Sequence, residues 1–330
     1  QYTYTISFDT QFPSYLSSRA RGVAIPYLDD EISECLRYLA PHRSGTDITP
    51  YLHENQERLE TAPVRDTIRA FIEFKSSADE PLRQEGRIQT TLSAAELEEQ
   101  VEGAMLMVRG ADWQAIAAHA KRNWAISYIM LLVAAAIHLR HRTETPTQRL
   151  VRLLEHLDQV GFFPKVEIHF VHTFFEQGNQ ERFFRHIQGN AKELTRKLAN
   201  MAWDLSHKRT IFDQVSAVAR GNDQHADFVV PYMLTFDQPL EAVLRGYQAN
   251  ALITYLQEGS KFITIYPLEV EARLHAAFES RLDLLSPERK AERLERGRVF
   301  FAEEARRNEL IQDAEALLAS ALPAPTSPTP

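Results

Sequence analysis

The feature that most constrains the fold is the spacing of strand-like segments in a chain that otherwise shows helical periodicity. Segments 2–8, 227–236 and 261–266 are rich in β-branched and aromatic residues, as short strands are. A long, mainly helical stretch separates the first two. Because parallel strands need long crossover connections, this order predicts an α/β domain with a central parallel sheet and helices on both faces. An all-helical protein is the alternative.

Helical periodicity covers most of the remaining chain. Leu97, Val101, Met105 and Val108, for example, recur on one face of an amphipathic helix. The periodic segments are 29–39, 64–74, 97–108, 113–141, 147–158, 183–207 and 286–319. Segment 162–178 is apolar enough for a strand or a helix, and its periodicity does not decide between them.

The most apolar stretch, 124–139, indicates a core helix rather than a membrane span. It is shorter than the roughly 20 residues that cross a bilayer, and it contains Ser127 and His138. The first residues of the chain lack the basic end and the apolar run of a signal peptide. We therefore expect a cytoplasmic protein that does not associate with membranes.

Charge and cysteine content exclude several classes of site. The 330 residues carry a formal net charge of -8 and include one cysteine, Cys35. A single cysteine allows neither an internal disulfide nor a metal site built from several thiolates. An acidic chain does not attract nucleic acid through its net charge, so a phosphate partner would require a local basic patch or bound metal ions.

Two of the predicted strands end at or beside an aspartate, Asp9 and Asp237. In an open parallel sheet ligands bind outside the carboxyl ends of the strands, so these two side chains are expected at one edge. Carboxylates at close range raise each other's pKa unless a cation lies between them. Mg²⁺ or Mn²⁺ prefers such oxygen ligands. The alternative is that both aspartates are turn or cap residues.

Four short motifs resemble those of the PIN-like nucleases, in the order in which that family has them. FDTQFPSYL carries Asp9 and LTFDQPLEAVL carries Asp237, while KVEIHFVHTFF contains Glu167 and KLANMAWDLSHKR contains Asp204. The resemblance covers the start of the chain and about 163–250. It implies a PIN-like α/β core in which these four acids hold one or two Mg²⁺ or Mn²⁺ ions and hydrolyse phosphodiester bonds.

The resemblance also implies a domain plan. Residues 1–280 would form the PIN-like domain with a helical insertion at about 30–160, followed by a helical extension over 281–320 and a disordered tail over 321–330. Two features depart from the family pattern. Gln11 stands where an Asn is expected, and the long connection from Asp204 to Asp237 leaves further candidates for the fourth acid, namely Asp213, Asp223 and Asp227.

Local charge supports a nucleic-acid partner. Segment 180–209 contains seven basic residues and three acidic ones. The basic residues expected to contact nucleic acid are Arg182, Arg185, Lys208 and Arg209. Phe183 and Phe184 could stack on the bases of a single strand. The alternative is a solvated helix face with two core phenylalanines.

These features together predict a metal-dependent nuclease that acts as a toxin or defence effector. Its predicted substrate is RNA rather than DNA. A protein inhibitor or a second copy of the chain are further partners to consider. Two alternatives stand beside this prediction. His169, His172 and Glu176 fall on one helical face and could bind Zn²⁺ or Mn²⁺. The protein could also be a non-enzymatic helical interaction or regulatory protein, with 97–157 and the charged C-terminal helices docking a partner.

Overall fold

The chain forms two compact units in the computed structural model. The structure describes residues 2–180, 182–185, 187–188, 193–219, 228–246, 251–257, 260–266, 275 and 278–322. The first unit combines residues 1–121 with 211–238, and the second combines 122–210 with 239–330.

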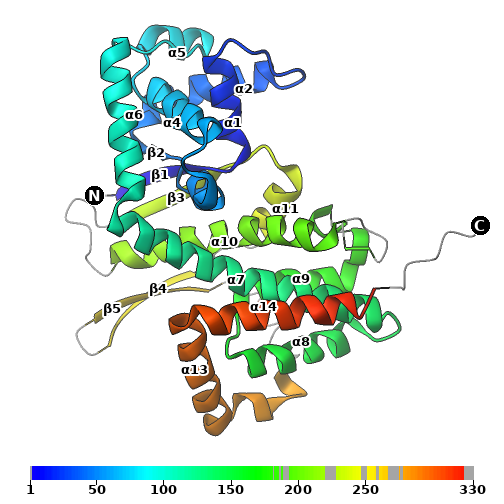
Figure 1. The fold of residues 1–330 in the computed structure, drawn as a ribbon. Helices are drawn as coiled ribbons and strands as arrows, with labels where there is room; N and C mark the ends of the chain where they lie inside the picture. The colour runs from blue at the N-terminus through cyan, green and yellow to red at the C-terminus, as the bar shows by residue number, and fades with distance from the viewer. Residues whose placement is uncertain are drawn as a thin grey trace, which may run out of the picture. The chain divides into compact units, whose positions relative to one another are not determined.

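A small parallel sheet forms the centre of the first unit (Figure 1). Strand β1 (Tyr2–Phe8) lies between β2 (Thr46–Asp47) and β3 (Phe228–Leu234), and both neighbours run parallel to it. In the register of the sheet Ile6 pairs with Thr46 on one side and with Tyr232 on the other. The predicted parallel sheet is confirmed, although β2 has too few residues to leave a pattern in the sequence.

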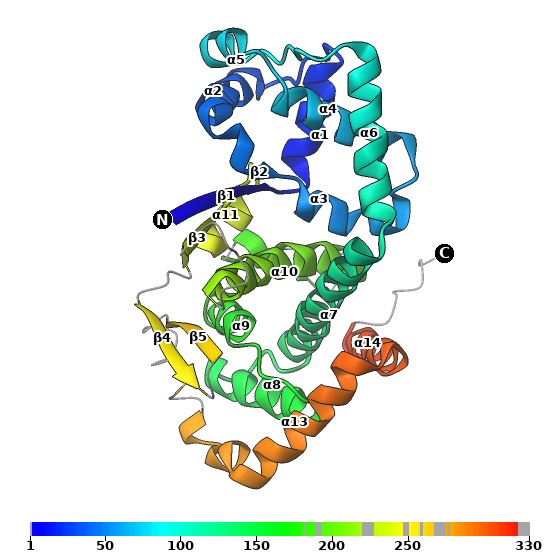
Figure 2. The same ribbon diagram turned by 90° about the vertical axis from the view of Figure 1, so that its left-hand side faces the viewer.

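Helices α1 and α4 lie on the same side of this sheet (Figures 1 and 2). The helices of this unit are α1 (Gln11–Ala20), α2 (Asp29–Leu39), α3 (Thr49–Glu54), α4 (Ala62–Lys75), α5 (Asp79–Glu85) and α6 (Ala94–Arg109). Short 3-10 turns occupy Ala40–Gly45 and Gln56–Arg58. The core begins at the sheet, where Phe8 meets Phe12 edge to face at 4.7 Å and both rings are fully buried. The covering of both faces and the PIN-like details stay predictions.

Helix α7 (Ala111–Arg140) runs from the first unit into the second. In the described part of the chain it is the one helix that is long and apolar enough to cross a membrane, with a mean hydropathy of 1.3 over its most apolar window. Because 83% of that window is buried inside the protein, the expected core helix is confirmed.

The second unit is mainly helical. Its elements are α8 (Pro146–Val160), α9 (Lys165–Gln177), α10 (Leu194–Ala219, whose last turns belong to the first unit), α11 (Gln238–Gly246), α13 (Pro287–Ala302) and α14 (Glu304–Ala319). Short 3-10 turns lie at Gly178–Gln180, Arg182–Phe184 and Leu282–Leu285. The segment left open between strand and helix is therefore helix α9.

One predicted strand pairs differently from expectation. Strand β5 (Ser260–Tyr266) forms an antiparallel hairpin with β4 (Ala251–Gln257) and does not join the parallel sheet. A two-residue connection favours this hairpin, since antiparallel neighbours can be joined directly. The helix expected over 183–207 is displaced along the chain, because its described part begins at Leu194 and continues to Ala219.

The observed division of the chain runs differently from the predicted one. Of the predicted insertion, 30–121 belongs with the sheet and 122–160 with the helical unit. The predicted extension over 281–320 is helical and shares a unit with 122–210. Most of the predicted tail, 323–330, lies outside the described residues.

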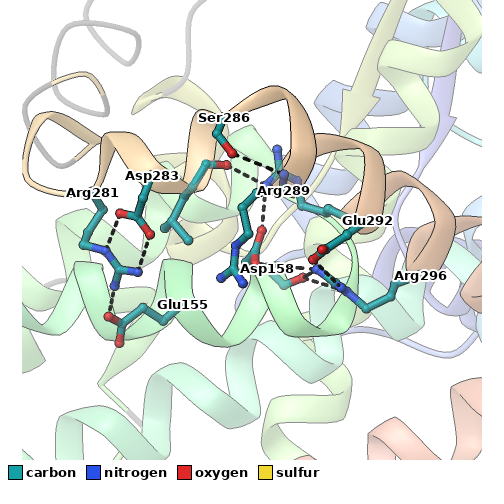
Figure 3. A network of polar contacts seen from close by, with 10 residues as sticks. Glu155, Asp158, Arg281, Asp283, Ser286, Arg289, Glu292 and Arg296 are labelled. Carbon is teal, nitrogen blue, oxygen red and sulfur yellow. Dashed lines mark hydrogen bonds and ion pairs between the residues drawn. The ribbon is translucent and has the colours of Figure 1, made fainter.

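A buried carboxylate joins α8 to α13 (Figure 3). Asp158 has no exposed surface, and its two oxygens lie 2.7 Å from Nη1 of Arg293 and 2.8 Å from Nη2 of Arg289. Its backbone oxygen accepts a bond of 3.0 Å from Arg296. Beside this cluster, Arg281 pairs with Glu155 and with Asp283. The network therefore anchors the C-terminal helices to the rest of their unit.

Candidate functional site

The carboxyl edge of the parallel sheet begins at Asp9, directly after β1. Its side chain is only 4% exposed. Oδ1 accepts hydrogen bonds of 3.0 Å from the backbone nitrogens of Gln11 and Phe12 in the first turn of α1. Oδ2 accepts a bond of 2.5 Å from the hydroxyl of Thr235. Asp9 thus caps a helix and also faces the loop that follows β3.

Thr235 connects the ends of β1 and β3. Its hydroxyl donates to Asp9 and accepts a bond of 3.0 Å from the backbone nitrogen of Asp237. The backbone nitrogen of Asp9 also donates to the carbonyl of Leu234 at 3.0 Å. The expectation that Asp9 and Asp237 follow neighbouring parallel strands is therefore confirmed.

Two further acids lie at this edge, one at the end of β2 and one at the end of α3. Asp47 ends β2 and accepts bonds from the hydroxyl of Ser7 at 2.7 Å and from the backbone nitrogen of Thr49 at 2.9 Å. Glu54 ends α3 and accepts a hydrogen bond from the hydroxyl of Thr10, the residue after Asp9. Neither acid could be predicted from the sequence, because β2 has only two residues and leaves no strand pattern.

The electrostatics of this edge centre on Asp9. Burial raises its pKa, and the nearby charge of Glu54 raises it further, while the bonds from Thr235, Phe12 and Gln11 lower it. Within the described ranges no basic side chain pairs with Asp9. The edge therefore holds a desolvated carboxyl group that no cation of the described residues neutralises.

Replacing Asp9 by asparagine should raise stability at neutral pH. A carboxyl group whose pKa is higher in the folded state than in the unfolded state destabilises the fold once it is ionised. This cost disappears as the pH falls below the unfolded value. We expect the Tm of Asp9→Asn to exceed that of the wild type at pH 7, with a difference that shrinks towards pH 3. Thermal unfolding across that range checks this, and a difference that grows on acidification would contradict it.

The edge can be tested for its fit to a hard cation. Among the residues with a described placement, no group of three or more His, Cys, Asp and Glu side chains gathers closely enough to hold a metal ion. Mg²⁺, however, commonly binds through one or two carboxylates and keeps several waters for contact with phosphates. A carboxylate offers about four acceptor positions, and Asp9 uses three. Asp9 and Glu54 therefore fit a cation that takes most of its ligands from water and substrate.

The second unit contains the other predicted acids. Glu167 in α9 is fully buried, and its Oε1 accepts bonds of 3.1 Å from the hydroxyl of Ser127 in α7 and from Nε of Arg209 in α10. Its Oε2 is buried without a hydrogen-bond partner. Asp204 lies one turn before Lys208 in α10. Glu167 is thus already paired with a cation of the protein.

The four basic residues predicted to contact nucleic acid differ in how exposed their side chains are. Arg182 and Arg185 are exposed. Lys208 is 5% exposed, lies 4.8 Å from the centre of the Phe170 ring, and has its pKa lowered to about 7 by burial. Together with the pairing of Arg209, this takes two of the four cations away from an exposed basic surface.

Two further expectations concern base stacking by Phe183 and Phe184 and a metal site on α9. Phe183 and Phe184 are buried, and Phe184 stacks on Phe174 at 4.8 Å, so neither ring is available to stack on bases. The core alternative is confirmed for both. His172 lies 3.8 Å from Glu176 in α9, but no metal-binding group forms there within the described part of the chain.

The predicted acids are divided between the two units. Asp9 and Asp237 belong to the first unit, whereas Glu167 and Asp204 belong to the second. Of the competitors for the fourth position, Asp213 lies in α10 with a side chain that is not described, and Asp223 and Asp227 lie outside the described residues. The full four-acid set stays a prediction.

Comparison with known proteins adds no relative. No protein-family model matches the sequence, and neither a curated protein nor a solved structure matches it.

Proposed function

We propose that the protein hydrolyses phosphodiester bonds in single-stranded RNA at the carboxyl edge of its parallel sheet, using Mg²⁺ or Mn²⁺. One observation carries this proposal. Asp9 is a buried carboxyl group without a basic partner in the described chain, and the charge of Glu54 lies close enough to raise its pKa. Two carboxyl groups close together at one edge of a parallel sheet favour a shared divalent cation.

Each residue of the edge has a defined part in this proposal. Asp9 and Glu54 would hold the cation, which supplies charge for the phosphate and an activated water. Thr235 orients Asp9 by donating to its Oδ2, and Thr10 orients Glu54 in the same way. Asp237 lies two residues after Thr235 and is a further acid of the edge. Glu167 is a weaker candidate because Arg209 already balances its charge.

Aromatic side chains beside the edge support a single-stranded substrate. Phe236 follows Thr235, stacks on Phe12 at 5.7 Å and meets Tyr15 edge to face, and both Phe236 and Tyr15 are partly exposed. Rings in such positions stack on unpaired bases without regard to sequence. In the described part of the chain, the one helix long and apolar enough to cross a membrane is mostly buried, and we propose a cytoplasmic location on that ground.

Cleavage of a labelled single-stranded RNA tests the proposal. We expect cleavage with Mn²⁺ and none with EDTA. Glu54→Gln should slow the reaction at least about tenfold, because an uncharged amide is a poorer ligand and leaves Asp9 alone with the cation. Glu99→Gln is the matched control, since Glu99 is an exposed acid in α6 of the same unit. Cleavage that persists in EDTA, or equal rates for the two variants, would contradict the proposal.

A further inference from the structure

A cleft of about 240 Å³ opens in the second unit, and none of the residues that line it belongs to the proposed nuclease edge. Residues of three helices line it, namely α7, α8 and α14. Val133 and Ala136 of α7 and Leu317 of α14 make its apolar part. Residues 133, 136, 137 and 140 recur at helical spacing, so one face of α7 supplies a whole wall.

The polar side chains of the cleft are mostly hydrogen-bond donors. Arg140 donates to the hydroxyl of Ser320, a neutral partner, and within the described residues it has no acidic one. Arg152 is held by Glu144 through Nε at 2.8 Å and Nη2 at 2.7 Å, which fixes its guanidinium group and leaves Nη1 available.

The remaining polar groups point to the same class of ligand. His156 makes no hydrogen bond in the described chain, and burial lowers its pKa while the charge of Asp313 opposes that shift. Glu155 is the one acid that lines the cleft, and its carboxylate already forms an ion pair with Arg281. The cleft therefore offers one guanidinium without an acidic partner in the described residues, a second guanidinium fixed by Glu144, the imidazoles of His141 and His156, and the amide of Gln159.

We propose that this cleft binds a small organic anion with an apolar body and a carboxylate head group. Guanidinium groups bind carboxylates with strong, directional hydrogen bonds. Sites of this kind combine an apolar wall with a few convergent polar groups. The volume lies just below the roughly 300 Å³ at which sites for drug-sized ligands begin, so the ligand is small. Arg140 and His156 bind the head, and Val133, Ala136 and Leu317 contact the body.

Calorimetric titration of the full chain tests this assignment with three probes. Sodium hexanoate carries both parts of the expected ligand, 1-hexanol carries only the apolar body, and sodium phosphate carries only an anionic head. We expect hexanoate to bind about tenfold more tightly than either of the others, which corresponds to one charge-assisted contact. Absence of hexanoate binding, equal binding of hexanol, or equal binding of phosphate would each overturn the proposal.

A pair of variants separates the cleft from general charge. Arg140→Gln should weaken hexanoate binding about tenfold. Arg142→Gln removes the same charge from an exposed side chain that does not line the cleft, and it should leave binding unchanged. Circular dichroism confirms that both variants fold. Equal losses in the two variants would show that binding is nonspecific. Neither Arg140 nor Arg142 belongs to the nuclease edge, so both variants should cleave RNA at the wild-type rate. A failed binding test would therefore leave the proposed nuclease function intact.

Discussion

Replacing Asp158 by asparagine is expected to destabilise the second unit by about 3–5 kcal/mol, the cost of breaking a buried ion pair from one side. The carboxylate is completely buried and lies against Arg289, Arg293 and Arg296, so its removal leaves three guanidinium groups without their shared anion. The side chain of Arg293 is 12% exposed and is poorly placed to recover its hydration.

The surface pair next to this cluster provides the control. Asp283 is 58% exposed and pairs with Arg281 (Figure 3), so Asp283→Asn should cost far less stability than Asp158→Asn. Urea unfolding followed by circular dichroism measures both effects, and hydrogen exchange in α13 reports the local one. Equal costs for the two variants would show that Asp158 does not anchor the C-terminal helices.

Replacing Asp9 by asparagine is expected to reduce Mn²⁺-dependent RNA cleavage at least about 100-fold while the fold persists. Loss of an outer-shell partner of a metal already lowers activity about 10–100-fold, and loss of a direct ligand should exceed that range. The amide oxygen of asparagine can still accept the bonds from Gln11 and Phe12, so the start of α1 should survive.

Two comparisons make this loss specific. Asp112→Asn removes an exposed acid from the first turn of α7 in the same unit and should leave cleavage unchanged. Asp9→Ala removes the cap as well as the charge, and should cost about 1 kcal/mol of stability that Asp9→Asn does not. A fully active Asp9→Asn variant would contradict a role of Asp9 in metal binding and leave it only the role of a helix cap.

Local patterns in the sequence predicted most individual elements. The run of β-branched and aromatic residues over 2–8 became β1, the strand over 227–236 became β3, and the periodicity of Leu97 to Val108 became α6. These elements are set by side chains close together in the chain, which is why pattern reading succeeds for them. Asp9 and the Thr235–Asp237 loop were predicted for the same reason, since each follows a strand with a clear pattern.

Contacts between distant segments set what pattern reading missed. Strand β2 has two residues and exists only because Ile6 and Ser7 pair with it, so neither β2 nor the position of Glu54 could be predicted locally. The partner of β5 is β4 rather than the sheet, a choice that depends on tertiary pairing. Aromatic content alone also did not show that Phe184 faces the core.

Titration of the full chain with Mn²⁺ tests most directly whether the sheet edge holds a divalent cation. Calorimetry of the wild type should show saturable binding that Asp9→Asn and Glu54→Gln each weaken at least about tenfold and that Asp112→Asn leaves intact. The same affinity in all four proteins, or no binding to the wild type, would contradict the account and favour a helical interaction protein.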